Sequence, residues 1–239
     1  MIPLRDANPT RRLSVVTIAL IAACAVVFAI ELSIKASGGD EALERFFLAW
    51  GAIPSRVTAA LAGTGDPGQA AIGVFGSLFL HAGWTHLLGN MLFLWIFGNN
   101  IEDRLGRLRF LAFYLAGGVL AALAQVWVQP DSSVPLIGAS GAIAATLGAY
   151  VVLYPRARVM TLIFLGIFTS IVQVPALLLL SFWFLLQLVS GVGSLGGATG
   201  DSGVAFFAHI GGFVAGAVVG LALRLGVGDA TRDRPSWPT

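Results

Sequence analysis

Long runs of apolar residues, separated by short polar segments, dominate the chain. A helix needs roughly 20 apolar residues to cross the hydrocarbon layer of a bilayer. Six runs approach this length, and we predict transmembrane helices at about residues 13–33, 84–101, 108–129, 140–154, 173–190 and 206–224. The pattern therefore predicts an all-α membrane protein built as a bundle of six transmembrane helices.

The apolar runs define one membrane domain at residues 13–225. A short segment at 1–12 precedes this domain, and we expect it on the cytoplasmic side. The tail at 226–239 is rich in Gly, Asp, Arg and Pro, and is predicted to be disordered. The first apolar run is longer than the core of a secretory signal, and no small-residue cleavage site follows it, so we predict a retained helix.

Two connections are longer than simple turns. The outer loop at about 35–80 carries aromatic residues beside polar ones, which is typical of a lobe at the membrane interface. Further along, Pro175 divides a long uncharged run, because proline breaks the hydrogen-bond ladder of a helix. We therefore predict an interfacial or re-entrant connection at 159–172 before the fifth helix.

Charge indicates the orientation and narrows the function. The chain is 57% hydrophobic and 11% charged, with a net charge of +2, so no basic stripe is available to bind nucleic acid. Eleven of the 14 Lys and Arg residues fall on one side of the predicted bundle. The positive-inside rule places that side, with both termini, in the cytoplasm, and the compact, Arg-rich chain suggests a bacterial inner membrane. The single cysteine, Cys24, is interpreted as a packing residue in the first apolar run.

Several polar residues gather near the outer ends of the predicted helices: His81, His86, Asn90, Ser140 and His209. Polar groups at membrane depth cost free energy unless they are paired or line a water-filled cavity. Their confinement to one leaflet indicates a functional site. A transporter or channel would instead spread polar residues through the bilayer.

Ser140 opens the fourth predicted helix within the segment Gly-Ala-Ser-Gly-Ala. Gly138 and Gly141 on either side allow a tight backbone and the close approach of other helices. A helix N-terminus presents free N–H groups and the positive end of the helix dipole, which favours a developing oxyanion. From this segment alone, Ser140 is either a nucleophile or a simple N-cap.

His209 lies in the first turn of the last predicted helix. Gly212 and Gly216 follow it as a GxxxG face, which allows two helices to touch backbone to backbone. His209 is three residues before Gly212 and shares that face, so docking on the fourth helix would bring His209 to Ser140. We interpret His209 as a general base; the alternative is a structural, hydrogen-bonded histidine.

His86 and Asn90 are four residues apart and share a face of the second predicted helix. Both can donate hydrogen bonds, which suits an oxyanion hole, although hydrogen bonding between helices is the alternative. His81 is predicted to be structural and to tether the first outer loop. The chain has no HExxH motif, and we expect no acidic residue in the core of a helix. A metal site is therefore disfavoured, and a Ser–His dyad without a carboxylate is predicted.

Together these motifs, in this order over about residues 70–225, resemble the rhomboid family of intramembrane serine proteases. Two flanking segments also fit bacterial members of the family: Phe79-Leu80-His81 and Glu102-Asp103-Arg104-Leu105-Gly106. The resemblance implies a six-helix rhomboid fold and an endopeptidase without metal or organic cofactor. It implies that the partners are single-span membrane proteins, cleaved within the lipid bilayer near its outer leaflet.

By position, the resemblance implies Ser140 as the nucleophile and His209 as its base. It implies an oxyanion hole formed by His86, Asn90 and the backbone N–H of Ser140. It also implies that substrates enter laterally between the second and fifth helices. The gate residues would lie on the fifth helix: Phe182, Trp183, Phe184 and Gln187.

The chain departs from the family pattern at two places. Ala144 stands where some members carry an aromatic residue that packs on the catalytic histidine, so the group that orients His209 is not identified. The first outer loop also lacks the Trp-Arg pair of some members. A rhomboid-like protein that binds clients without cleaving them is the competing class, and the intact Ser140–His209 pair disfavours it. The sequence identifies neither the substrate nor the oligomeric state.

Overall fold

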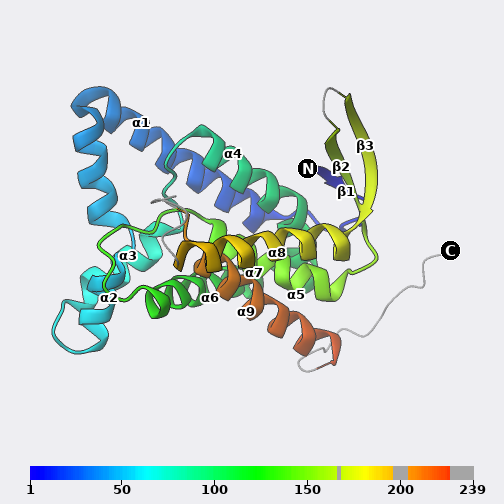
Figure 1. Ribbon diagram of the computed structural model, residues 1–239. Helices are drawn as coiled ribbons and strands as arrows, with labels where there is room; N and C mark the ends of the chain where they lie inside the picture. Colours follow the sequence, from blue (N-terminus) through cyan, green and yellow to red (C-terminus); the bar gives the residue numbers. More distant parts are fainter. Residues whose placement is uncertain (166–167, 196–203, 227–239) are drawn as a thin grey trace.

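The computed structural model describes residues 1–165, 168–195 and 204–226 of the chain. The described part is mainly helical, with a small sheet at one end of the bundle and two short helices at the other (Figure 1). In chain order, the elements are β1 (Ile2–Asp6), α1 (Val15–Trp50), α2 (Pro54–Leu61), α3 (Pro67–Ser77), α4 (Trp84–Phe93), the π-helical segment η1 (Leu94–Gly98), α5 (Asn99–Leu105), α6 (Arg107–Val128), α7 (Ser140–Leu153), β2 (Arg158–Leu165), β3 (Phe168–Pro175), α8 (Ala176–Leu195) and α9 (Phe206–Arg224). The predicted tail at 226–239 lies outside the described residues except for Gly226.

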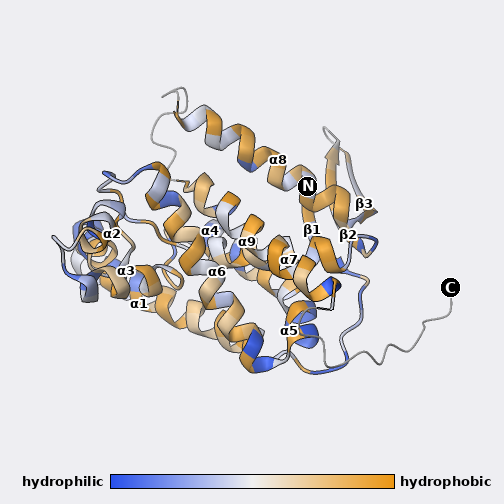
Figure 2. Ribbon diagram, turned by 90° about the horizontal axis from the view of Figure 1, so that it is seen from below, coloured by the Kyte–Doolittle hydropathy of each residue, from blue (hydrophilic) through white to orange (hydrophobic). Residues whose placement is uncertain are grey.

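The predicted apolar runs coincide with helical segments, so the prediction of a mainly helical membrane fold is confirmed. Within the described chain, α1, α6, α8 and α9 are each long and apolar enough to cross a membrane. The α7 helix is apolar but shorter, and α4, η1 and α5 follow one another directly. Figure 2 shows apolar residues along the middle of the bundle and polar residues towards its two ends. The number of six spans stays a prediction.

The α7 helix is the centre of the bundle. Every residue from Gly141 to Val151 is buried, and most of them are small or aliphatic. Small residues let α6 and α9 approach α7 closely, because little side-chain volume separates the backbones. Ser140 begins this helix, so the most buried element of the fold carries the predicted nucleophile.

The segment predicted to form the first outer loop is more helical than the sequence indicates. The α1 helix continues past residue 33 to Trp50, with a kink at Gly39, whose φ of 71° lies in the left-handed region that favours glycine. The α2 and α3 helices complete a lobe at this end of the molecule (Figure 1). The fifth predicted helix begins at Ala176, immediately after Pro175.

The start of α1 is held by a buried carboxylate on α5. Glu102 accepts hydrogen bonds from the backbone N–H groups of Val16, at 2.9 Å, and Thr17, at 2.7 Å. The Thr17 hydroxyl donates to the same carboxylate at 2.8 Å. The first turn of a helix has unpaired N–H groups, so Glu102 acts as an N-cap supplied by a distant element.

A second buried carboxylate corrects an expectation from the sequence. Glu31 lies inside α1 and is 2% exposed, so the expectation that no acidic residue occupies the core of a helix was wrong. Its Oε1 accepts a hydrogen bond from the backbone N–H of His81 at 3.0 Å. Glu31 therefore ties α1 to the turn before α4.

The sequence analysis did not predict the three-stranded sheet. Its strands are antiparallel, in the order β1–β2–β3, and Ile2 pairs with Leu162. The connection predicted at 159–172 is thus mostly the β2–β3 hairpin. Pairing between the chain start and this hairpin is non-local, which local periodicity does not reveal.

Asp6 joins the sheet to the helical bundle. Its carboxylate accepts hydrogen bonds from Asn100 Nδ2 on α5, at 2.8 Å, and from Tyr150 Oη on α7, at 2.7 Å. Burial raises the pKa of the Asp6 carboxyl above its ordinary value, and the hydrogen bonds from Tyr150 and Asn100 oppose that shift. The folded protein therefore binds a proton at Asp6 more readily than the unfolded chain does.

We predict that Asp6→Asn changes the pH dependence of stability. A raised carboxyl pKa makes the charged form costly at neutral pH, and this cost disappears as pH falls through the folded pKa. The unfolding temperature of the variant, relative to wild type, should therefore be higher near neutral pH than near about pH 4. Thermal unfolding of both proteins in one detergent at both pH values measures this. A difference that does not change with pH would contradict the prediction.

Candidate active site

Ser140 stands at a strained approach to α7. Gly138, two residues earlier, has a φ of 124°, which side chains other than hydrogen rarely tolerate. Its N–H donates to Ser77 O at 2.8 Å, and a Cβ at this position would lie 2.6 Å from Nε2 of His86. Gly138 therefore provides both the backbone turn into α7 and the space for the His86 ring beside Ser140.

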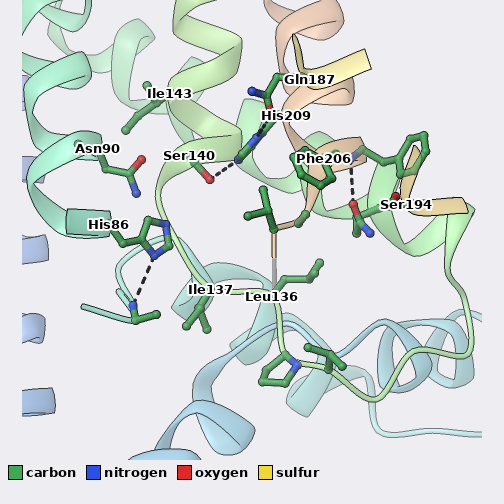
Figure 3. A pocket seen from close by; sticks show the side chains of 18 of the residues that line it. His86, Asn90, Leu136, Ile137, Ser140, Ile143, Gln187, Ser194, Phe206 and His209 are labelled. Atoms are coloured by element: carbon green, nitrogen blue, oxygen red, sulfur yellow. Dashed lines mark hydrogen bonds between the residues drawn. The ribbon is translucent and has the colours of Figure 1, made fainter. Parts of the chain in front are cut away.

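Ser140 and His209 form a hydrogen bond. Nε2 of His209 lies 2.7 Å from Oγ of Ser140, and Nδ1 of His209 lies 2.8 Å from Oε1 of Gln187 on α8 (Figure 3). An amide oxygen can only accept, so the Nδ1–H of His209 donates to Gln187. Nε2 is then the acceptor that faces the Ser140 hydroxyl. This is the tautomer in which a histidine can remove the serine proton.

Backbone contact between α7 and α9 sets the distance between these two residues. A Cβ added at Gly212 would collide with the carbonyl oxygen of Gly141, and one added at Gly216 would collide with that of Ala145. A Cβ at Gly148 of α7 would in turn collide with the backbone of α9. No larger side chain fits these positions without separating the helices.

A glutamine on α6 fixes the first turn of α9. Oε1 of Gln125 accepts the backbone N–H groups of Phe207, at 3.1 Å, and Ala208, at 3.2 Å. Nε2 of Gln125 donates to Oε1 of Gln129 at 2.9 Å. The sequence analysis missed Gln125. Its only signal is a pair of glutamines four residues apart near the end of an apolar helix, a spacing that places both on one face.

His86 and Asn90 face the same space as Ser140 from α4 (Figure 3). The Ala82 N–H donates to Nδ1 of His86 at 3.4 Å, which leaves Nε2 to carry the ring proton in the neutral form. Nδ2 of Asn90 is buried and has no hydrogen-bond partner among the residues that the structure describes. Two residues on α4 that can donate hydrogen bonds thus line the space beside Ser140.

His81 lies behind this site, not in it. It is 1% exposed, and Nδ1–H of its ring donates to Phe79 O at 3.1 Å. Its ring packs edge-to-face on His86, with the centroids 5.2 Å apart. Together with the bond from its N–H to Glu31, these contacts support the turn that precedes α4.

The predicted gate residues divide between two faces of α8. Trp183 and Gln187 line the active-site cavity, and the Trp183 ring centroid is 5.9 Å from that of His209. Phe184 stacks on Phe213 of α9, with centroids 4.4 Å apart. Phe182 is 47% exposed and is not part of the cavity wall.

The cavity has a volume of about 720 Å³ and contains Ser140 and His209. Its walls come from α4, α6, α7, α8, the start of α9 and the loop before α7. Polar side chains reach it from several elements: Thr85, Gln125, Gln129, Ser132 and Ser194. In the described chain, no three His, Cys, Asp or Glu side chains group closely enough to hold a metal ion.

These features define a helical integral membrane protein with a hydrogen-bonded serine and histidine in a cavity lined by both apolar and polar side chains. The family model for the rhomboid domain matches residues 69–225, and the chain belongs to the rhomboid family. The chain is 35% identical over 144 residues to the rhomboid protease GluP of Bacillus subtilis, covering 60% of this chain and 25% of that protein.

Other curated relatives match over shorter segments. The chain is 33% identical over 97 residues to rhomboid protein 1, mitochondrial, of Saccharomyces cerevisiae, covering 39% of this chain and 28% of the relative. It is 38% identical over 73 residues to the putative rhomboid protease YdcA of Bacillus subtilis, covering 30% and 36%. The matches thus span about a quarter to a third of these relatives.

We predict that Gly212→Val separates α9 from α7 and abolishes proteolysis before the protein unfolds. The new side chain would collide with the Gly141 carbonyl, and a displacement of about 1 Å at a catalytic group can cost on the order of 100-fold in rate. Cleavage and thermal unfolding are measured on the same preparations. Gly193→Val on α8 is the matched control, because a Cβ there has no neighbour within 4 Å. Near-normal cleavage by Gly212→Val would show that this contact does not set the site.

Proposed function

We propose that the protein is an intramembrane serine endopeptidase that uses a Ser140–His209 dyad. The observation that carries this proposal is the 2.7 Å contact between Oγ of Ser140 and Nε2 of His209, inside a cavity of a rhomboid-family chain. The proposed reaction is hydrolysis of a peptide bond in a membrane-anchored protein. No metal or organic cofactor takes part in this proposal.

The chemistry follows from the two side chains. Oγ of Ser140 attacks the scissile carbonyl carbon while Nε2 of His209 takes the hydroxyl proton. The tetrahedral intermediate collapses when His209 returns this proton to the leaving amine, so the C–N bond breaks and an acyl-enzyme remains. Water then attacks the acyl carbon with His209 again as base, which releases the new carboxyl end and restores Ser140.

The negative oxygen of the intermediate needs hydrogen-bond donors. We assign this role to the backbone N–H of Ser140, to Nε2–H of His86 and to Nδ2 of Asn90. Ser140 is the first residue of α7, where the helix dipole also favours negative charge. Nδ2 of Asn90, which has no hydrogen-bond partner in the described part of the chain, supports the assignment, because a buried donor without a partner costs free energy that an oxyanion would recover.

Water is a substrate of the second half-reaction. The polar residues of the cavity wall, among them Gln125 and Gln129, support a hydrated site at membrane depth. We propose that this cavity opens towards the outer side, because 11 of the 14 Lys and Arg residues fall on the opposite side of the predicted bundle. Both termini would then be cytoplasmic, and cleavage would occur near the outer leaflet. The cell membrane of a bacterium is the proposed location; the relatives described above include a bacterial and a mitochondrial protein.

We propose that single-span membrane proteins enter laterally between α4 and α8. The cavity lies between these helices, with His86 and Asn90 on one side and Trp183 and Gln187 on the other. A substrate must present an extended backbone to Ser140, so segments with small or helix-breaking residues are the expected cleavage sites. Phe182, on the exposed face of α8, and Phe184, on the face that packs against α9, would affect how readily the gate opens.

The dyad predicts that Ser140→Ala and His209→Ala each reduce cleavage of a model single-span substrate by on the order of 1,000-fold or more. The double variant should lose little beyond either single variant, because the two groups act as one unit. A fluorophosphonate should label wild type but not Ser140→Ala, and a metal chelator should change neither activity nor labelling. Strong turnover by purified Ser140→Ala would refute the proposal that the Ser140–His209 dyad catalyses cleavage. Binding of the substrate by wild type without cleavage or labelling would indicate a client-binding protein instead.

The gate predicts that a disulfide between α8 and α9 blocks substrate entry but spares the chemistry. A Cβ built at Gly191 would lie 3.3 Å from Cβ of Phe206, close to the roughly 3.5–4.5 Å of a disulfide. In a Cys24→Ala background, oxidised Gly191→Cys/Phe206→Cys should cleave membrane substrates at least about 10-fold more slowly, and reduction should restore the rate. Labelling by a small fluorophosphonate should persist in both states. Equal cleavage by the oxidised and reduced forms would exclude movement of α8 from α9 as the gate.

A further inference from the structure

The Ser140–His209 dyad assigns no role to Gln187, although Gln187 accepts a hydrogen bond from His209. A histidine that acts as a base needs one ring nitrogen protonated and the other free, and its partner at the first nitrogen selects this state. In this chain the acceptor is Oε1 of Gln187, 2.8 Å from Nδ1 of His209. Ala144, where an aromatic residue would pack in some relatives, gives no ring contact.

We propose that Gln187 is the positioning residue for His209, and that it aligns the base only while α8 lies against α9. This inference rests on the proposed protease function and adds a third residue to it. Gln187 touches neither the substrate carbonyl nor the reacting oxygen in this role. It acts through the imidazole.

A neutral amide suits this position at membrane depth. A carboxylate there would bring a buried charge that costs free energy without a paired cation, whereas the amide oxygen accepts the Nδ1–H without charge. The amide oxygen cannot take the proton, so the bond selects the tautomer that leaves Nε2 facing Ser140. The Gln187 bond therefore supplies orientation.

The α8 helix holds His209 from two directions. The Trp183 ring lies beside the imidazole, at 5.9 Å between centroids, and Gln187 binds its edge. Both residues are four positions apart on α8 and share one face of the helix. A movement of α8 away from α9 therefore removes both contacts at once.

The attachment of α8 to the bundle is weak along most of its length. Only four residues of the helix are buried: Ala176, Leu179, Leu180 and Gly191. Between Leu180 and Gly191, aromatic contacts to Phe213, from Phe184 at 4.4 Å and Trp183 at 6.2 Å between centroids, join α8 to α9 together with the contacts to His209. Opening of the proposed gate would thus disengage the base, and closure behind the substrate would align it.

Gln187 also lines the cavity, so a role in substrate contact alone is the competing explanation. A small fluorophosphonate separates the two roles, because it reacts with Ser140 without a bound membrane segment. If Gln187 orients His209, its loss slows labelling and lowers kcat. If Gln187 only contacts substrate, its loss raises KM and leaves labelling unchanged.

The test compares Gln187→Met, which keeps the length but has only a weak acceptor, with Gln187→Glu, which keeps a strong acceptor. We expect Gln187→Met to slow labelling and kcat together by about 10- to 100-fold, with KM within about twofold. Gln187→Glu should recover most of the lost rate. Because a carboxylate favours the protonated imidazole, its activity should begin to fall at a higher pH on the acid side than wild-type activity does. Leu185→Met, at a lipid-facing position that is 53% exposed, controls for a methionine on α8.

Each outcome decides the matter. Labelling of Gln187→Met at the wild-type rate would overturn the proposal, even if cleavage fell. If Gln187→Met does not fold, as thermal unfolding would show, Gln187→Glu decides alone, and an acid limb identical to that of wild type overturns the proposal. Wild-type protein that neither cleaves nor becomes labelled would instead refute the protease function itself.

Discussion

The backbone contact between α7 and α9 is the constraint on which the site depends. Gly212 and Gly216 lie so close to α7 that its carbonyl oxygens leave no room for a methyl group. In a bilayer, lipid tails are as apolar as the helix surfaces, so close packing of this kind supplies much of the attraction between helices. The same contact fixes His209 opposite Ser140. Fold stability and catalytic geometry therefore share one set of atoms.

Polar residues around this contact are organised by hydrogen bonds between helices. Glu102 caps α1, Glu31 binds the turn before α4, and Gln125 caps α9 from α6. In each case the polar side chain satisfies backbone N–H groups that lie at or near membrane depth. Water is scarce at this depth and cannot replace these bonds. An arrangement of helices that breaks them is therefore disfavoured, even when its apolar packing is similar.

Much of this architecture is visible in the sequence, because helical spans and GxxxG faces depend on local spacing. The apolar runs located the helices, and the position of His209 three residues before Gly212 predicted which face it shares. The sheet was not predictable in this way, since Ile2 and Leu162 pair across most of the chain. Glu31 was expected at the end of the first helix, because a charge normally ends an apolar run, whereas α1 continues to Trp50. Its partner is a backbone N–H 50 residues away, and no pattern encodes that bond.

Gln187 and Gln125 also show that local sequence patterns do not reveal contacts between distant elements. Gln187 was assigned to a gate from its place on the fifth helix, yet its bond to His209 depends on the rotation of α8 about its axis. That rotation is set by the Phe184–Phe213 stack and the other contacts of α8 with its neighbours. The spacing of Gln125 and Gln129 shows that they share a helix face, but it does not reveal that Gln125 caps α9, because a capping side chain on a different helix has no fixed sequence separation from the turn it caps.

The base of α8 is anchored where the β-sheet ends. The N–H groups of Ala176 and Leu177 donate to the carbonyls of Ala157, at 2.8 Å, and Pro155, at 3.2 Å, and Ala176 is fully buried. The helix is therefore a lever with its fulcrum at Ala176. Gln187 lies about 17 Å along this lever at 1.5 Å per residue, so a tilt of only about 10° would carry its amide roughly 3 Å sideways. A hydrogen bond does not survive such a displacement. A tilt of α8 too small to open the interior of the bundle would therefore already break the hydrogen bond that orients His209.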